Sequence, residues 1–424
     1  MNKYPEEKPP VKPVDPGILP EARTIKLDNR IPVYLLNAGT EDIVRIEFIF
    51  KAGNVFEKIP LLASATNAML NEGTLNYSSS RINKMFDFHG AFINQYTDKD
   101  LGGVVIFALH KNLKKILELA REILFLPVFP ASELKAMLKK RLRLFLINRE
   151  KVHNLATDKF YETIFGSDHP YGRQVVADDF NNLEPCMLRD FHKKHYTTGS
   201  LAIILSGKIN DKVHETINQI FGGLSSRGSS QIKPAENPVL RDSIKTHVKK
   251  QDALQTAIRI GSATINKCHP DYPGLKITDM VLGGYFGSRL MKKIREEKGY
   301  TYGIYSSVSS LNISGYKVIS TEVSKKNTQK AIDEIMKEIR SLQSVPAGRD
   351  ELNVVRNYML GELLRMFDGP FAVAESFRSV WQYGLDNSYY YRLAEKIKTI
   401  DADEITSLAG TYYNIDELNI ITAG

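Results

Sequence analysis

Cysteine is nearly absent from this 424-residue sequence, which contains only Cys186 and Cys268. Two cysteines are too few for a disulfide framework and too few for a thiolate zinc site. Cys186 has no His and Asn constellation to activate it, so we expect an inert thiol. The sequence also lacks a run of about 18 apolar residues, and its N-terminus lacks the apolar core of a secretory signal. We therefore expect a cytoplasmic protein with reduced thiols and no membrane partner.

The motifs of common catalytic sites are missing as well. Neither of the zinc-hydrolase patterns, H-E-x-x-H and H-x-x-E-H, occurs, and there is no G-x-S-x-G elbow or G-x-x-x-x-G-K-[ST] phosphate loop. The nearest pair of metal ligands is His192 and His195, but two lysines separate them and no third ligand is evident. We favour a solvated helix face there over a metal site. The glycines of Leu282–Ser288 do not have dinucleotide-binding spacing, and we expect them to let a loop pass close to something bulky.

The composition is that of a soluble globular protein with a moderate excess of positive charge. Hydrophobic residues make up 42% and charged residues 25%, and 57 Lys and Arg against 49 Asp and Glu give a net charge of +8. The most basic run is Lys135–Arg149, which also has Leu134, Leu138, Leu142 and Phe145 at helical spacing. An amphipathic helix with one core face and one solvated face is the commoner origin of such a pattern than a nucleic-acid or membrane-surface helix. We therefore expect no nucleic-acid partner.

Two breaks divide the chain. Six of the 18 prolines lie in the first 20 residues, which predicts an extended arm over residues 1–20. A small, polar, turn-rich stretch predicts a linker over residues 223–238. The sequence thus predicts an N-terminal domain over residues 21–222 and a C-terminal domain over residues 239–424.

The two halves show an internal repeat. The strand-like runs Val44–Phe50 and Val104–Leu109 have counterparts in Ala257–Ile260 and Tyr316–Val323. Each of these runs is followed by a helical pattern. Each landmark in the second half lies about 210–218 residues after its counterpart in the first half. The order of these landmarks predicts an α+β fold of two homologous domains, each an antiparallel β-sheet packed with α-helices.

These landmarks resemble the insulinase/pitrilysin family of zinc metallopeptidases. The likeness is to its short two-domain members, such as the subunits of the mitochondrial processing peptidase and bacterial two-subunit relatives. It covers nearly the whole chain after the N-terminal arm. The segments that carry it are, in order, Ala52–Gly53, Met69–Thr74, Gly90–Thr97, His169–Arg173, Phe191–Tyr196, Gly287–Leu290 and Ile294–Tyr302.

The zinc motif of the family is degenerate in this sequence. Active members read H-F-L-E-H-M-L-F-x-G-T before the Gly73–Thr74 pair, so the resemblance assigns the two zinc histidines to Ser64 and Ala68 and the glutamate base to Asn67. The third ligand of active members, a glutamate, would fall near Leu144–Phe145, in a run without acidic residues. None of these side chains can replace imidazole and carboxylate around zinc. We predict that this chain holds no metal and that zinc belongs only to a partner chain.

The resemblance also implies an active role for the C-terminal half. In family members with a working site, that half contributes an arginine and a tyrosine seven residues apart, and Arg295 and Tyr302 have this spacing. A guanidinium fork and a phenol are fixed donors that can hold a substrate carbonyl and stabilise an oxyanion. The alternative is an ion pair of Arg295 with a nearby Glu, beside a half-buried Tyr302. The resemblance further implies that backbone groups near Gly90 and Asn94 pair with an extended peptide.

Two functional hypotheses follow. In the first, the chain is the non-catalytic subunit of a two-chain zinc peptidase, inactive alone, and supplies Arg295 and Tyr302 in trans to an H-x-x-E-H partner. In the second, it is an inactive pseudopeptidase that forms a homodimer and serves as a peptide-binding or structural module. Both hypotheses expect extended peptides as ligands.

Overall fold

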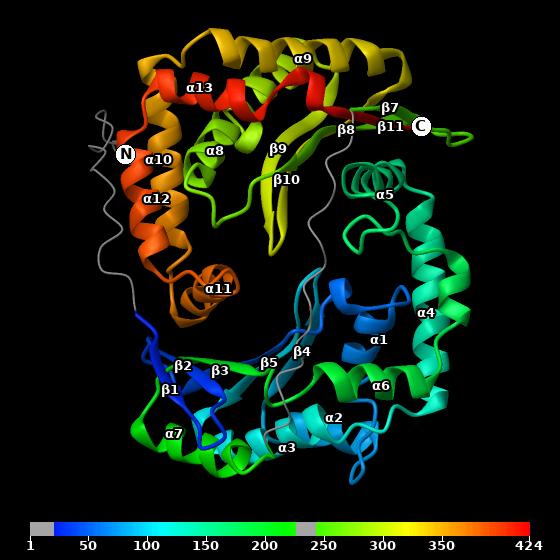
Figure 1. The fold of residues 1–424 in the computed structure, drawn as a ribbon, viewed down its shortest axis with the longest axis vertical. Helices are drawn as coiled ribbons and strands as arrows, with labels where there is room; N and C mark the ends of the chain where they lie inside the picture. The colour runs from blue at the N-terminus through cyan, green and yellow to red at the C-terminus, as the bar shows by residue number, and fades with distance from the viewer. Residues whose placement is uncertain (1–20, 226–242) are drawn as a thin grey trace, which may run out of the picture.

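The computed structural model describes residues 21–225 and 243–424, which fold around two β-sheets (Figure 1). The expected arm over residues 1–20 lies outside the described residues, as does the expected linker apart from residues 223–225. Within the described residues, the first sheet has the strand order β1-β2-β6-β3-β5-β4 and the second has the order β7-β11-β8-β10-β9.

The strands of the first sheet are β1 (Arg23–Lys26), β2 (Pro32–Asn37), β3 (Ile43–Phe50), β4 (Phe92–Thr97), β5 (Gly102–Leu109) and β6 (Ala202–Gly207). Those of the second are β7 (Lys245–Val248), β8 (Gln255–Thr264), β9 (Thr301–Leu311), β10 (Ser314–Ser324) and β11 (Asn419–Ala423). With β1 set aside, the two orders correspond strand for strand. In each sheet one pair is parallel, β2 with β6 and β7 with β11, and the other pairs are antiparallel. The α+β class and the duplication are thus confirmed, with one parallel pair in each sheet.

Helices cover the sheets. In the first half they are α1 (Leu62–Ala68), α2 (Ser79–Phe88), α3 (Leu113–Phe125), α4 (Ala131–Arg149), α5 (Val152–Phe165), α6 (Pro185–His195) and α7 (Asp211–Ile217). In the second half they are α8 (Tyr272–Asp279), α9 (Thr328–Ser344), α10 (Arg349–Arg365), α11 (Pro370–Trp381), α12 (Ser388–Thr399) and α13 (Ala402–Tyr412). A π-helical segment, η6 (Met291–Glu297), precedes β9. No helix among the described residues combines the length and the apolar composition that crossing a bilayer requires.

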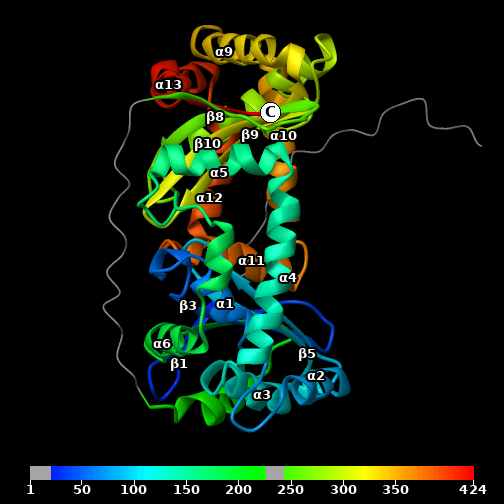
Figure 2. The ribbon, with the colours of Figure 1, turned by 90° about the vertical axis from the view of Figure 1, so that its right-hand side faces the viewer.

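The two halves exchange one helix each. Helix α5 leaves its own half and packs on β8 and β11 of the second sheet, where Phe160 and Ile164 join a core cluster with Ile421 (Figures 1 and 2). Helix α11 packs in return on β2 and β6 of the first sheet, where Phe377 joins a cluster with Leu36. The strands β6 and β8 on which these helices pack are therefore largely buried on both faces, and β6 is almost continuously apolar.

Helix α4 is the long connection between the two halves (Figure 2). Its 19 residues span about 28 Å at 1.5 Å per residue. Leu134 and Leu138 are buried, as the helical spacing predicted, and Leu142 and Phe145 pack against the same core. Leu144, at 51% exposure, lies outside this face. The exposed basic residues are Lys135, Lys139, Lys140 and Arg143.

The β9–β10 hairpin meets the first half at its tip. The backbone N–H of Asn312 donates to an Asp100 carboxylate oxygen (3.0 Å), and the Tyr171 hydroxyl donates to the other. The opposite end of β9, where Thr301 begins the strand, lies ten residues from Leu311 at the tip, about 33 Å at 3.3 Å per residue. This end of the second sheet therefore lies far from the contact with Asp100, but α5 of the first half reaches it, since His153 Nδ1 lies 3.5 Å from a Glu322 carboxylate oxygen on β10.

Candidate functional site

Helix α1 carries the three positions of the degenerate zinc motif. It is only seven residues long and begins after Leu61, whose φ of +71° is left-handed. The Ser64 hydroxyl donates to the Leu61 carbonyl (3.1 Å), so the side chain stabilises the first turn of its own helix. Ala68, four residues later, brings only a methyl group to the second histidine position.

Asn67, at the position of the glutamate base, has a structural role. Its amide nitrogen donates to the Gly103 carbonyl (3.1 Å) and to the Tyr196 hydroxyl (3.0 Å), and the residue is only 2% exposed. Burial raises the pKa of Tyr196 far above its usual value, so the phenol stays neutral. Asn67 therefore ties α1 to β5 and to the end of α6 and has no proton-accepting group for catalysis.

A cation occupies the side of the motif that faces α4. Arg141 donates from Nη1 to the Ser64 hydroxyl oxygen (3.3 Å) and from Nη2 to the Ser64 carbonyl (3.4 Å). Burial lowers the pKa of Arg141, but a guanidinium stays charged at neutral pH. Near the expected third-ligand position, Phe145 instead packs its ring against Phe180 at 5.2 Å. A fixed positive charge at this point repels a divalent cation.

Sequence reasoning missed Arg141. Its position could have indicated the contact, because Arg141 lies one helical turn before Leu144–Phe145 on the buried side of α4. The basic run that contains it was interpreted as solvated helix surface. Across the residues that the structure describes, no group of three or more His, Cys, Asp or Glu side chains could hold a metal ion. The absence of zinc itself stays a prediction for a metal assay.

The interpretation of His192 and His195 as a solvated helix face is wrong. His192 Nε2 bonds the Leu124 carbonyl (2.8 Å), and His195 Nδ1 bonds the Lys51 carbonyl (3.1 Å). The His195 ring also stacks on Phe191 at 4.3 Å, and burial lowers its pKa to about 4. The two rings anchor α6 to different backbone segments and do not converge on a common ligand position.

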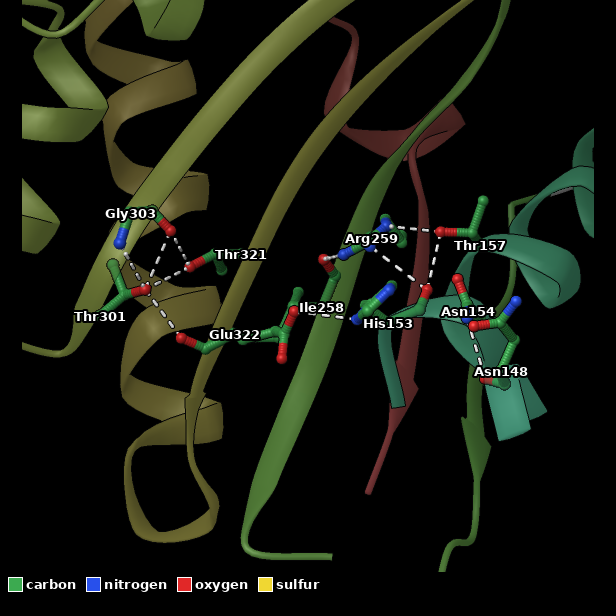
Figure 3. Close-up of polar contacts among 10 residues, drawn as sticks. All are labelled: Asn148, His153, Asn154, Thr157, Ile258, Arg259, Thr301, Gly303, Thr321 and Glu322. Atoms are coloured by element: carbon green, nitrogen blue, oxygen red, sulfur yellow. Dashed lines mark hydrogen bonds and ion pairs between the residues drawn. The ribbon is translucent and has the colours of Figure 1, made fainter. Parts of the chain in front are cut away.

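Tyr302 lies in a β-bulge that directs its side chain to the surface. Ile304 pairs with Thr321 and Thr301 pairs with Val323, so Tyr302 and Gly303 together stand opposite the single residue Glu322. The Thr301 hydroxyl donates to the Glu322 carbonyl (2.7 Å), and the Thr321 hydroxyl donates to the Gly303 carbonyl (2.9 Å), as Figure 3 shows. The bulge is thus held from both strands, and it leaves the Tyr302 side chain 93% exposed.

Arg295 lies beside this bulge on η6. Its Nε donates to the Tyr302 carbonyl (2.8 Å), and its guanidinium lies 4.6 Å from the centre of the Phe286 ring and 5.7 Å from that of Tyr302. Among the described residues, no ion pair or further hydrogen bond involves its terminal nitrogens. The alternative of an ion pair beside a half-buried tyrosine therefore does not match the geometry. We call Arg295, Tyr302 and Phe286 the Arg–Tyr cluster.

Phe286 is the member of this cluster that sequence reasoning missed. It belongs to the glycine-rich stretch Leu282–Ser288 and is 57% exposed. A Cβ on Gly283 would lie 2.8 Å from the Ser306 nitrogen of β9, and one on Gly287 would lie 2.8 Å from the Tyr285 ring. The glycines thus allow the close approach that was expected of them, and this approach brings Phe286 against Arg295.

Gly90 and Asn94 lie far from the Arg–Tyr cluster, in the other half. Gly90 makes the turn from α2 into β4 with a φ of +60°, where glycine is favoured. Asn94 is exposed on β4, the edge strand of the first sheet, and its backbone pairs with β5 on one side only. The structure therefore brings together Arg295 and Tyr302, and separately Ser64, Asn67 and Ala68, but not these groups with one another.

Comparison with known proteins supports the resemblance. The family model of the peptidase M16 inactive domain matches residues 182–359. The uncharacterized zinc protease YmxG of Bacillus subtilis is 23% identical over 298 residues, covering 70% of this chain and 72% of the relative. The non-peptidase homolog YmxG of Helicobacter pylori is 21% identical over 376 residues, covering 86% and 85%.

Solved structures show the same fold. The crystal structure of a peptidase M16 inactive domain from Pseudomonas fluorescens matches with a TM-score of 0.85 and 22% identity, covering 95% of this chain and 97% of that one. The ordered motifs, the duplicated sheets and these relatives lead to one assignment. The chain is similar to the peptidase M16 family, the insulinase/pitrilysin group.

Proposed function

We propose that this chain is the non-catalytic subunit of a two-chain M16 peptidase. In this arrangement the partner carries H-x-x-E-H and zinc, and this chain adds Arg295 and Tyr302 in trans. The observation that carries the proposal is the Arg–Tyr cluster, in which Arg295 is bonded to the Tyr302 backbone carbonyl and keeps its terminal N–H groups free, 5.7 Å from the centre of the exposed Tyr302 ring. Two such donors suit a peptide carbonyl whose oxygen becomes negative during attack by water.

The place of the cluster supports action on a second chain. The tip of the β9–β10 hairpin contacts Asp100 of the first half, whereas Tyr302 lies at the other end of β9, where α5 contacts Glu322 through His153 and leaves the Tyr302 side chain exposed. Helix α1 of this chain offers no zinc ligand, because its three motif positions carry a methyl, an amide and a hydroxyl. The Arg141 guanidinium lies beside the hydroxyl. An exposed aromatic pair such as Tyr302 and Phe286 is also the type of surface that becomes desolvated in an interface.

The ligand in this proposal is an extended peptide. The free edge of β4 offers unpaired backbone groups to such a peptide, and Asn94 on that edge is exposed. A cytoplasmic location, in which the two thiols would stay reduced, belongs to the same proposal.

The test is reconstitution with a homologue from the same genome that retains H-x-x-E-H. Peptide cleavage by the mixture is compared for the natural chain and for Arg295→Ala with Tyr302→Phe. Loss of oxyanion-type donors is expected to lower turnover about 100-fold or more. Lys292→Ala, which removes an exposed cation from the same segment, is the matched control and should cleave normally. An undiminished rate in the double variant would rule out the role in trans.

The second candidate is a homodimeric pseudopeptidase that binds peptides without cleaving them. The name of the Helicobacter pylori relative, a non-peptidase homolog, favours it. Light scattering on the purified chain distinguishes the two candidates. A stable dimer that does not exchange with an H-x-x-E-H homologue supports the second, and a monomer that pairs with the homologue supports the first.

A further inference from the structure

A polar cavity of about 370 Å³ lies beside α5, between the end of α4 and residues 170–175. It has no part in the Arg–Tyr cluster, and the proposed function does not use it. The charged side chains that line it are Glu57, Lys99, Arg149, Asp158 and Arg173. Three cations thus face two carboxylates, which leaves a surplus of one positive charge.

One of the ion pairs in this cavity is already complete. Arg173 lies 3.5 Å from a Glu57 carboxylate oxygen and donates to the carbonyls of Glu57 (3.0 Å) and Lys58 (3.2 Å). The second Glu57 oxygen accepts from the Ala63 N–H (2.9 Å). Burial raises the pKa of Glu57 to about 7, which further reduces its negative charge at neutral pH. These two residues have little capacity for a ligand.

The other two cations have donors to spare. The Lys99 ammonium donates to the Tyr171 carbonyl (3.0 Å) and has no other hydrogen-bond acceptor among the described residues. The Arg149 side chain has no hydrogen bond or ion pair within the described part of the chain, and its guanidinium lies 5.5 Å from the centre of the Phe145 ring. Burial raises the pKa of Asp158, and the charges of Lys99 and Arg149 lower it. Neither cation forms an ion pair with Asp158. Glu57 and Asp100 also act on the charge of Lys99, but neither carboxylate accepts a hydrogen bond from it among the described residues.

The cavity also has an acceptor without a donor. Asn54 lines the cavity, and its buried Oδ1 has no hydrogen-bond partner among the residues that the structure describes. A buried acceptor in this condition costs free energy that a ligand N–H would recover. On the α5 side, Asn154 donates to the Asn148 carbonyl (2.8 Å), and both line the cavity with Thr157 (Figure 3).

We propose that this cavity binds the carboxylate of an amino acid or of a peptide C-terminus. The carboxylate takes the free donors of Lys99 and Arg149, and the N–H next to it donates to Asn54 Oδ1. One negative charge neutralises the surplus, and the arginine fork matches the two carboxylate oxygens. The volume is at the lower end for small-molecule sites, which suits one or two residues.

Calorimetry on the full chain, without a partner, tests this site. The probes are N-acetyl-alanyl-alanine, its C-terminal amide and free alanine. The free acid is expected to bind about tenfold or more tightly than the amide, because only the acid pairs with the two cations. Equal affinity of the acid and the amide, or no binding of either acid probe, overturns the proposal.

Variants locate the binding. Arg149→Gln should weaken the acid about tenfold and leave the amide unchanged, whereas Arg143→Gln, on the exposed face of the same helix, should change neither. Unaltered binding to Arg149→Gln overturns the assignment. Tighter binding of the acetylated dipeptide than of alanine identifies a peptide terminus as the source, and the reverse identifies a free amino acid. Since no partner or cleavage is involved, failure here is distinct from failure of the proposed function.

Discussion

The Nε of Arg295 donates a hydrogen bond to the backbone carbonyl of Tyr302 over 2.8 Å. This bond joins the π-helical segment η6 to the bulge on β9, so the two residues are held as one unit. The bulged carbonyl is one that the ladder leaves unpaired, and the arginine satisfies it while its terminal nitrogens stay free. The pair is thus ordered before any ligand arrives.

The hydroxyl of Thr321 should be required for the bulge. Thr321→Val removes the donor to the Gly303 carbonyl, and we expect a loss of about 1 kcal/mol in the free energy of unfolding. Urea titration measures this loss. Ser344→Ala, which removes an exposed hydroxyl bonded within α9, should cost less than about 0.5 kcal/mol. A loss no larger than that of the control would mean that the hydroxyl does not support the bulge.

Asn67 should matter for stability and not for chemistry. Asn67→Ala leaves the buried Gly103 carbonyl and the Tyr196 hydroxyl without their donor, and about 2–3 kcal/mol of unfolding free energy should be lost. The exposed Asn76, which donates to Glu122, provides the control, and Asn76→Ala should cost about 0.5 kcal/mol or less. Denaturant unfolding compares the two variants. Similar values for both would contradict the structural role.

Arg141 should oppose zinc even when histidines are restored. In a Ser64→His, Ala68→His variant, the guanidinium would lie beside the new imidazoles and repel a divalent cation. Adding Arg141→Ala should therefore tighten zinc binding by about tenfold or more. Competition with a fluorescent chelator gives both affinities, and thermal melting confirms that both variants fold. Equal affinities would show that the guanidinium does not obstruct the position.

His195 should make stability depend on pH on the acidic side. Its pKa is lowered by burial to about 4, below the usual 6.5, so the unfolded chain takes up the proton first as pH falls. This contribution is complete above pH 6.5 and is lost progressively between pH 6.5 and 4, up to about 3 kcal/mol. The difference in unfolding free energy between the natural chain and His195→Phe, measured from pH 7 to pH 4.5, isolates this effect from other groups. A difference that does not change with pH would contradict it.

The sequence predicted what depends on local pattern. Alternation in runs such as Val44–Phe50 and the repeated order of landmarks indicated two homologous sheets, and the family resemblance paired Arg295 with Tyr302. What it missed depends on long-range packing. The approach of Arg141 to Ser64 and of Phe286 to Arg295 joins segments that no local spacing links. The burial of His195 depends on a partner 144 residues away, the carbonyl of Lys51.

The bulge was also invisible in the sequence. A bulge is set by the register of two strands, and neither Tyr302 nor Glu322 reveals by its type that two residues will face one. The sequence also did not show on which sheet α5 and α11 pack. An apolar face predicts that a helix is buried, but it does not say on which of two similar sheets.

That exchange of helices makes the two halves of the chain move as one rigid body. Moving the halves apart would strip α5 from β8 and α11 from β6, and would bring Phe160 and Phe377 into water. Hinge motion inside one chain is therefore costly. If two such chains enclose a peptide between them, the peptide can enter and leave only when one whole chain moves relative to the other. The affinity between the two chains would then set how long the substrate stays enclosed.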